Sequence, residues 1–194
     1  MQFKIKEISV KVSFSSLALI LYFIVTDNLK IYLITLFCAL IHELAHIMTI
    51  YMFNGNIKSI AFTVAGGNIE RGTNFEFSFI KEAMVNACAP VVNIILGILF
   101  YYRGSALKDF STVNFMLGAF NLLPFHTFDG GRFLKNILLY FFDYKKVKVV
   151  TNSVSVLVAM IFTIVSVLVF VKYEKNYFLI LFSLYMILSI ILDY

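Results

Sequence analysis

Two histidines and a glutamate stand together inside a strongly apolar stretch of the chain. His42 and His46 are four residues apart, so on a helix they share one face, and Glu43 directly follows the first histidine. Two imidazoles at this spacing can bind one metal ion, and the adjacent carboxylate can serve as a general base in hydrolysis. An Asp or Lys at the centre of a membrane helix costs on the order of 2.5–3.5 kcal/mol. Three ionisable groups within five positions therefore predict a zinc hydrolase site inside a membrane.

A catalytic zinc ion usually has three protein ligands and a water, so two histidines leave one ligand to be found. Asp129 is the candidate, since Pro124 breaks the preceding helix and two glycines after Asp129 permit tight backbone turns. The alternative for Asp129 is an ordinary exposed turn, in which Asp-Gly is common. Cys38 and His126 could also ligate, but we expect a small buried thiol and a loop residue near the substrate channel.

The composition points to an integral membrane protein. The chain has 194 residues, of which 61% are hydrophobic, against roughly half in soluble domains. One domain, residues 1–194, accounts for this length. Both cysteines, Cys38 and Cys88, fall in apolar segments, so no disulfide is expected. The net charge of +5 is explained by basic residues on the cytoplasmic side of the membrane, with anionic lipid expected near Lys145, Lys146 and Lys148. Nothing in the sequence suggests a nucleic-acid partner.

The predicted fold class is an all-α polytopic membrane protein with about six transmembrane helices. The expected spans are residues 9–26, 31–53, 84–102, 110–124, 147–171 and 177–193. The basic residues before the first span resemble a signal peptide, but no small-residue cleavage site follows, so we expect an uncleaved span. Turn residues and alternating apolar residues in segment 54–82 predict a small β-sheet at the membrane surface after the second span.

The distribution of lysine and arginine predicts the orientation. With the amino terminus in the cytoplasm, eleven of the 16 basic residues lie on the cytoplasmic side and five outside, and both termini are cytoplasmic. The second span then runs inward and carries His42–His46 in its cytoplasmic half. The fourth span also runs inward and ends near Pro124, which brings Asp129 to the same side as the histidines.

These motifs resemble the site-2 protease family of intramembrane zinc metalloproteases, of the M50 type. The family pairs an intramembrane H-E-x-x-H with a later N-x-x-P-x-x-x-x-D-G, matched here by His42–His46 and Asn121–Gly130. Ala89–Asn93 is similar to the family's A-G-P-x-x-N. The resemblance covers spans two to four, roughly residues 38–135, within a predicted protease core of residues 31–135. The resemblance implies that one zinc ion is held by His42, His46 and Asp129 and that Glu43 is the general base. It also implies that Asn93, Asn121 and Pro124 contact the substrate or the oxyanion. Helix–helix hydrogen bonding is the alternative for the two asparagines.

The chain is most similar to the sporulation branch, whose known member cleaves a membrane-associated pro-sigma factor. The resemblance implies an endopeptidase of a bacterial cell membrane that cleaves a membrane-tethered pro-sigma or anti-sigma factor near the cytoplasmic face. Regulatory membrane proteins are its implied further partners. That branch commonly carries a nucleotide-binding CBS domain after the last span, whereas this sequence stops at Tyr194, so no nucleotide-binding domain is expected.

Two other functions fit a membrane site with this residue set. A zinc transporter would be expected to carry polar residues along several spans, and the last two spans carry almost none. An inactive protease-like scaffold is disfavoured because His42, Glu43, His46 and Asp129 are all intact.

Overall fold

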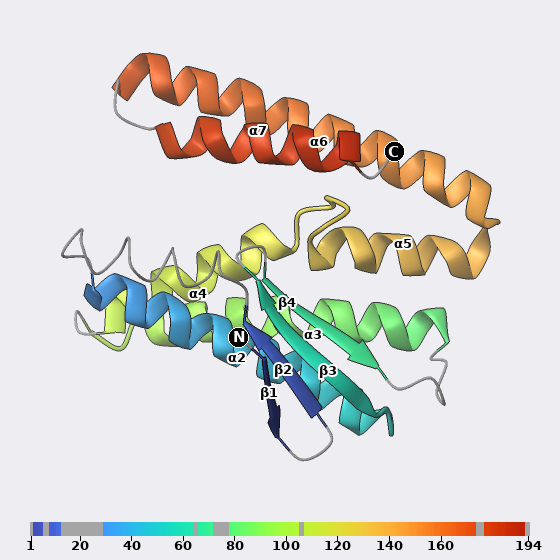
Figure 1. Cartoon of the computed structure of the whole chain (residues 1–194). Helices are drawn as coiled ribbons and strands as arrows, with labels where there is room; N and C mark the ends of the chain where they lie inside the picture. Colours follow the sequence, from blue (N-terminus) through green and yellow to red (C-terminus); the bar gives the residue numbers. More distant parts are fainter. Residues whose placement is uncertain are drawn as a thin grey trace. The chain divides into compact units, whose positions relative to one another are not determined.

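The computed structural model describes residues 2–5, 8–12, 29–63, 66–71, 78–104, 107–173 and 177–192. Contacts between Cα atoms divide the chain into two compact units, Met1–Phe120 and Asn121–Tyr194. The sequence predicted a single domain of residues 1–194. The colours of Figure 1 follow the sequence, so the first unit runs from blue to yellow and the second from yellow to red.

The described residues of the first unit form three helices and a sheet. The helices are α2 (Leu29–Met52), α3 (Phe79–Tyr101) and α4 (Lys108–Asn121), whose last residue belongs to the second unit. Helix α3 begins where the Ser78 side chain accepts a hydrogen bond from the Lys81 N–H, which satisfies one of the free donors of the first turn. Helices α2 and α3 pack against each other, with Ile50 and Val85 in their shared core.

Helix α4 approaches α3 very closely at two glycines. A Cβ atom added at Gly97 would lie 2.9 Å from Phe115 Cβ, and one added at Gly118 would lie 2.7 Å from the Pro90 carbonyl oxygen. Larger side chains at these positions would hold the two helices apart. The small residues therefore let polar side chains of α3 and α4 reach one another, as in other membrane helix pairs.

The sheet has four strands in the order β1-β2-β3-β4: β1 (Gln2–Ile5), β2 (Ile8–Val12), β3 (Ile57–Thr63) and β4 (Gly66–Arg71). Strand β2 runs parallel to β3, and the other two pairs are antiparallel (Figure 1). The predicted sheet segment 54–82 includes an alternating stretch, residues 75–79; residues 72–77 lie outside the described residues, and Phe79 begins α3.

The predicted fold class is therefore wrong. It was all-α, with a small sheet confined to segment 54–82 and a first span beginning at residue 9. Residues 8–12 form β2, and two of the four strands come from the amino terminus. The physical reason is that Ile8, Val10 and Val12 alternate with Ser9 and Lys11 in a strand pattern, while the lysines nearby also resemble the basic flank of a span. Residues 13–26 of that span lie outside the described residues.

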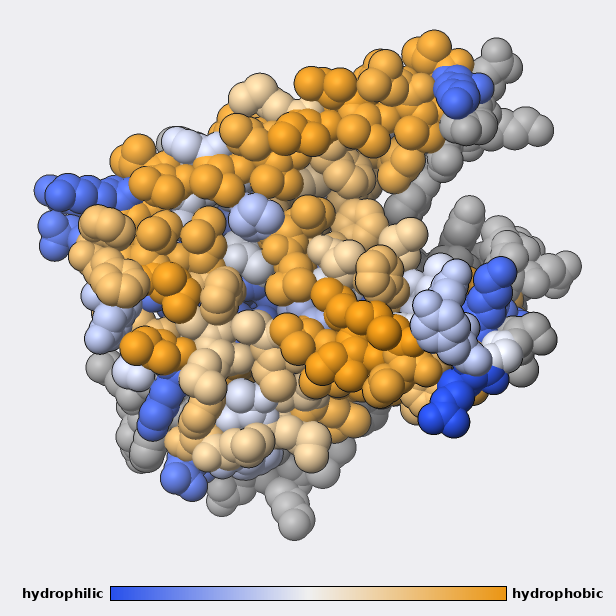
Figure 2. Space-filling view, turned by 180° about the vertical axis from the view of Figure 1, so that it is seen from behind, coloured by the Kyte–Doolittle hydropathy of each residue, from blue (hydrophilic) through white to orange (hydrophobic). Residues whose placement is uncertain are grey.

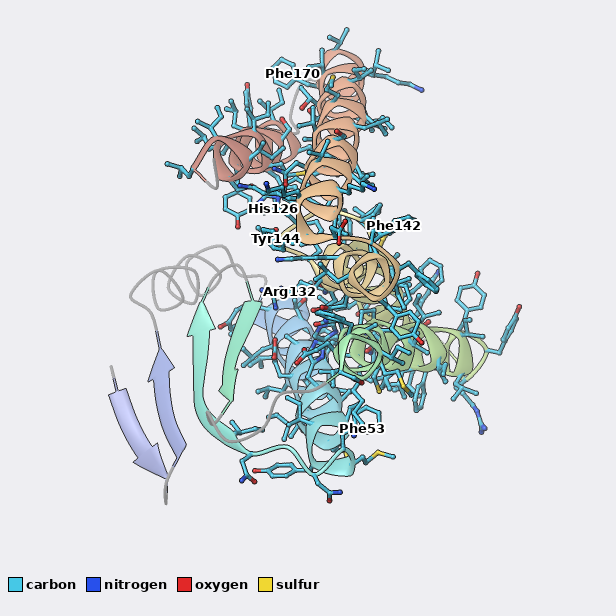
Figure 3. The ribbon with its side chains drawn as sticks, turned by 90° about the vertical axis from the view of Figure 1, so that its right-hand side faces the viewer. Phe53, His126, Arg132, Phe142, Tyr144 and Phe170 are labelled. Carbon is cyan, nitrogen blue, oxygen red and sulfur yellow. The ribbon has the colours of Figure 1, made fainter. Side chains whose placement is uncertain are left out.

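The described part of the second unit includes the helices α5 (Asp129–Phe141), α6 (Tyr144–Tyr173) and α7 (Tyr177–Leu192). Phe142 and Tyr144 lie at the short junction between α5 and α6 (Figure 3). Helices α6 and α7 lie side by side, and their core contains Ala159 and Met186 (Figure 1). Helix α5 was not among the predicted spans and is too short, at 13 residues, to cross a bilayer.

Three of the described helices are long and apolar enough to cross a membrane, against six predicted spans. They are Leu29–Met52, Phe79–Tyr101 and Tyr144–Lys172, while the apolar part of α7, Leu179–Leu192, is shorter. Helix α4 covers the predicted span 110–124 but has only 14 residues. Large apolar side chains are exposed along these helices and cover much of the face in Figure 2, which is the pattern expected of a protein solvated by lipid.

Candidate metal centre

The two histidines of the first motif lie side by side on α2. Their ring centroids are 4.9 Å apart and their planes are nearly perpendicular, at 86°. One ring nitrogen of His42 and one of His46 lie within 4.8 Å of each other. Both side chains are buried, at 6% and 8% exposure. The helical spacing therefore brings two potential ligand atoms close together.

Each histidine uses its Nδ1 atom to contact an oxygen on α3. His42 Nδ1 lies 2.7 Å from Asn93 Oδ1, and His46 Nδ1 lies 2.9 Å from the Val85 carbonyl oxygen. A carbonyl oxygen only accepts hydrogen bonds, so His46 Nδ1 carries the hydrogen and donates it. Its Nε2 atom then keeps the lone pair that a metal needs. An oxygen partner on the second ring nitrogen is the usual support of a metal-binding histidine, so this donor set fits zinc.

Glu43 lies one residue from His42 on the same helix. The residue is partly buried, and its Oε2 atom is inaccessible to solvent. On an ideal helix the Glu43 side chain leaves the backbone about 100° away from His42, whereas His46 leaves it on nearly the same side as His42. That position suits a base next to the ligands better than a ligand.

Asn93 is fully buried on α3 and makes several contacts inside the first unit. Its Oδ1 faces His42, and its Nδ2 donates to Asn114 Oδ1 at 2.7 Å and to the Cys38 carbonyl oxygen at 3.5 Å. These two bonds use both hydrogens of the amide. Asn93 thus supports His42, whereas an oxyanion contact would require one of these bonds to break.

Asp129, the predicted third ligand, is the first residue of α5 in the second unit. It is buried, at 6% exposure. A carboxylate in the first turn of a helix is favoured by the helix dipole. The residue before it, Phe128, is extended and starts the helix, and its carbonyl accepts from the Arg132 N–H at 3.1 Å.

The irregular segment 122–128 is fixed to the second unit ahead of Asp129. Phe125 is fully buried in the core with Ala159 and Met186. The His126 N–H donates to Ser155 Oγ on α6 at 3.1 Å. His126 itself is partly buried and lies in this segment between α4 and α5 (Figure 3). The core contacts therefore hold the segment that carries the Asp-Gly-Gly sequence.

The two glycines after Asp129 are required by this close approach. A Cβ atom at Gly130 would collide with the Leu122 carbonyl, and one at Gly131 would collide with the Phe125 carbonyl. Both contacts are with backbone, which cannot turn aside. The glycines therefore let segment 122–128 fold back over the start of α5, which explains why they follow the carboxylate.

The remaining predicted positions lie on or near these elements. Asn121 is the last residue of α4, and Pro124 lies in segment 122–128; both are partly buried. Cys38 is fully buried on α2, where its sulfur accepts from Asn114 Nδ2 at 3.0 Å. Asn114 was not predicted as a site residue, although a buried amide in the middle of an apolar helix is a signal that could have found it.

Three comparisons with known proteins each found a match. The family model of peptidase family M50 matches residues 105–166. A zinc metalloprotease of Methanocaldococcus jannaschii is 28% identical over 155 residues, which are 75% of this chain and 43% of that relative. The chain thus spans less than half of the relative's length.

A solved structure gives the fold. It is a site-2 protease from Methanocaldococcus jannaschii, with a TM-score of 0.70 and 23% identity, covering 98% of this chain and 93% of that one. The family model, the curated relative and the solved structure together support a relationship of this chain to peptidase family M50 and its site-2 proteases.

Proposed function

We propose that the chain is an intramembrane zinc endopeptidase of family M50. His42, His46 and Asp129 would hold the zinc ion, and Glu43 would act as the general base. The observation that carries the proposal is the paired histidines on an apolar helix, each with Nδ1 directed to an oxygen. The similarity to a zinc metalloprotease and to a site-2 protease supports the same chemistry.

The proposed reaction is hydrolysis of a peptide bond. Zinc supplies Lewis-acid chemistry when bound, lowering the cost of negative charge on the scissile carbonyl. Glu43 takes a proton from the attacking water as the water oxygen adds to the carbonyl carbon. The same carboxyl group then gives that proton to the amide nitrogen as the C–N bond breaks. Asn121 and Pro124 are proposed to contact the substrate backbone.

The proposed substrate is a membrane-tethered regulatory precursor of the pro-sigma or anti-sigma type, cleaved where its backbone is extended. Carbonyl groups in a helix are already hydrogen-bonded, so an extended segment presents the bond more readily. His42 and His46 are buried on α2, a helix apolar enough to cross a membrane, and this supports a substrate that reaches the site through the bilayer. Regulatory membrane proteins remain proposed partners.

The proposed orientation places the start of α6 in the cytoplasm. Lys145, Lys146 and Lys148 lie in its first turns, whereas Lys172 is the basic residue of its last turn. The histidines lie in the carboxyl-terminal half of α2, and the chain continues from that end of the helix to Lys58 and Arg71, which supports a site near the cytoplasmic face with both termini in the cytoplasm. Labelling of a cysteine placed at Val149 by a membrane-impermeant reagent from the outside would contradict this orientation.

The decisive variant is Glu43→Gln, tested on membrane-tethered candidate precursors in cells. General-base catalysis contributes about 10²–10⁴-fold, so cleavage should fall by at least about 100-fold while zinc content is kept. Glu82→Gln, the same change on a partly buried residue of the first turn of α3, should leave cleavage unchanged. Cleavage by the Glu43→Gln protein at the wild-type rate would overturn the proposed function.

The alternatives predict different results. A zinc transporter would move zinc into proteoliposomes without cleaving any precursor, and that flux should survive Glu43→Gln. An inactive scaffold would bind a precursor without either activity. Both alternatives would be excluded by cleavage that requires Glu43.

A further inference from the structure

A continuous line of buried polar side chains crosses three helices of the first unit. It starts on α4 at Asn114, passes Asn93 on α3 and ends at His42 on α2. Asn93 and Asn114 are both fully buried, at 0% exposure. Apolar side chains would pack these helices at lower cost, because each buried amide must be desolvated. The line of amides therefore calls for a specific explanation.

The Asn114 end of this line determines which group donates and which accepts in each hydrogen bond. Asn114 Nδ2 donates to the Phe110 carbonyl oxygen at 3.0 Å, and a backbone carbonyl can only accept. Asn114 must then turn its Oδ1 toward Asn93, which donates through Nδ2. The Cys38 carbonyl oxygen, 3.5 Å from Asn93 Nδ2, requires the same orientation. Asn93 consequently presents Oδ1 to His42 Nδ1.

The last step decides the state of the imidazole. Because Asn93 Oδ1 is an acceptor, the neutral His42 ring carries its hydrogen on Nδ1 and keeps the lone pair on Nε2. If the Asn93 amide were turned by 180°, its NH₂ group would face His42 and favour the opposite tautomer, with the lone pair on Nδ1. That lone pair would be used by Asn93 and unavailable to a metal.

We infer that Asn114 is a positioning residue for zinc binding: through Asn93 it holds His42 in the tautomer that presents Nε2. The inference rests on the proposed function, which supplies zinc as the ligand. His46 offers the internal comparison, because the Val85 backbone carbonyl holds its Nδ1 directly, with no side chain in between. Loss of Asn114 should therefore disturb His42 and leave His46 unchanged.

The first experiment compares the full-length wild type with Asn114→Leu in detergent. Two quantities are measured: the histidine tautomers in the zinc-free protein, by ¹⁵N NMR of labelled histidine, and the affinity for zinc alone. In the wild type we expect the Nδ1–H form at both His42 and His46. In the variant we expect a mixture at His42 only, and zinc affinity lower by about tenfold, the lower end of the effect of losing a ligand's support.

Two further variants separate positioning from packing. Ser111→Ala removes another buried α4–α3 hydrogen bond, Ser111 Oγ to the Gly97 carbonyl at 2.6 Å, without touching the line of amides. It should change neither the tautomer nor zinc affinity. Asn114→Asp keeps an oxygen acceptor for Asn93 Nδ2 and should restore both values to near the wild type.

A milder substitution covers the case in which Asn114→Leu does not fold. In Asn114→Thr the hydroxyl should bond to the Phe110 carbonyl, as Thr35, Thr49 and Thr163 bond to the carbonyl four residues earlier in this chain. The threonine side chain is one bond shorter than asparagine and does not reach Asn93. It should therefore reproduce the His42 mixture in a folded protein.

The outcomes distinguish this inference from the proposed function. If His42 stays in the Nδ1–H form and zinc affinity is unchanged in folded Asn114→Leu or Asn114→Thr, the inference is overturned. An equal loss in Ser111→Ala, or no recovery in Asn114→Asp, would also overturn it. If the wild type does not bind zinc, the proposed function fails instead, while the tautomer measurement still decides the role of Asn114.

Discussion

His42 and His46 have the same spacing and residue type as many helical metal pairs, but each is held by a different kind of partner. The first depends on a side-chain amide and the second on a backbone carbonyl. The sequence can predict that two residues four apart share a face. It cannot predict which group on another helix will meet each ring, because that depends on the packing of α3 and α4 against α2.

The proposed role of Asp129 as the third zinc ligand can be tested by a single substitution. Under the proposed function, in which Asp129 is a zinc ligand, Asp129→Asn should lower zinc affinity by more than about 100-fold, because removing a ligand should exceed the 10–100-fold effect of removing a ligand's support. Zinc affinity is measured by competition with a chelator of known strength. His126→Asn is the matched control, since His126 is the third histidine of the chain and should leave affinity unchanged. If His126→Asn lowered zinc affinity and Asp129→Asn left it unchanged, the third ligand would be His126.

At the scale of elements, the start of α5 and segment 122–128 act together. Phe125 anchors the segment in the core, and Gly130 and Gly131 leave room for its carbonyls. The sequence predicted a helix break at Pro124 and tight turns at the glycines. It did not predict that Asp129 would begin a helix of 13 residues, because α5 lacks the continuous apolar run of a span.

The substitution Gly131→Ala tests this arrangement. Its methyl group would collide with the Phe125 carbonyl, so the segment must shift, and overpacking of this kind typically costs about 1–3 kcal/mol. We expect a lower thermal midpoint in detergent and weaker zinc binding. Arg132→Ala changes the next, exposed residue of the same turn and should alter stability by less than about 0.5 kcal/mol. Equal stability of Gly131→Ala and the wild type would refute the proposed need for glycine.

The sheet contains the segment whose secondary structure was predicted wrongly, residues 8–12. Residues 8–12 alternate like a strand, but the lysines around them also resemble the flank of a membrane span. Strand β2 pairs in parallel with β3, and the paired residues are 50 positions apart in the chain; local sequence carries little information about such long-range pairing. The motif residues were easier to predict, since their chemistry is local.

At the scale of the whole molecule, the three long apolar helices determine where the protein resides. Ile161 is exposed near the middle of α6. Arginine at a helix centre costs on the order of 2.5–3.5 kcal/mol on the insertion scale, so Ile161→Arg should sharply reduce the fraction of chains that resist alkaline extraction from membranes. Val149→Arg places the same charge beside Lys148, where a long side chain can reach the headgroups, and should insert normally. Equal insertion of both variants would contradict a crossing by α6.

The unequal anchoring of the two histidines has a consequence for how this protein can change over evolutionary time. A backbone carbonyl is present whatever residue occupies position 85, so the support of His46 survives almost any substitution there. The support of His42 passes through two replaceable side chains, Asn93 and Asn114. Metal affinity can therefore be retuned through one histidine while the other keeps its alignment, and related chains that differ in metal preference should differ first at these two asparagines.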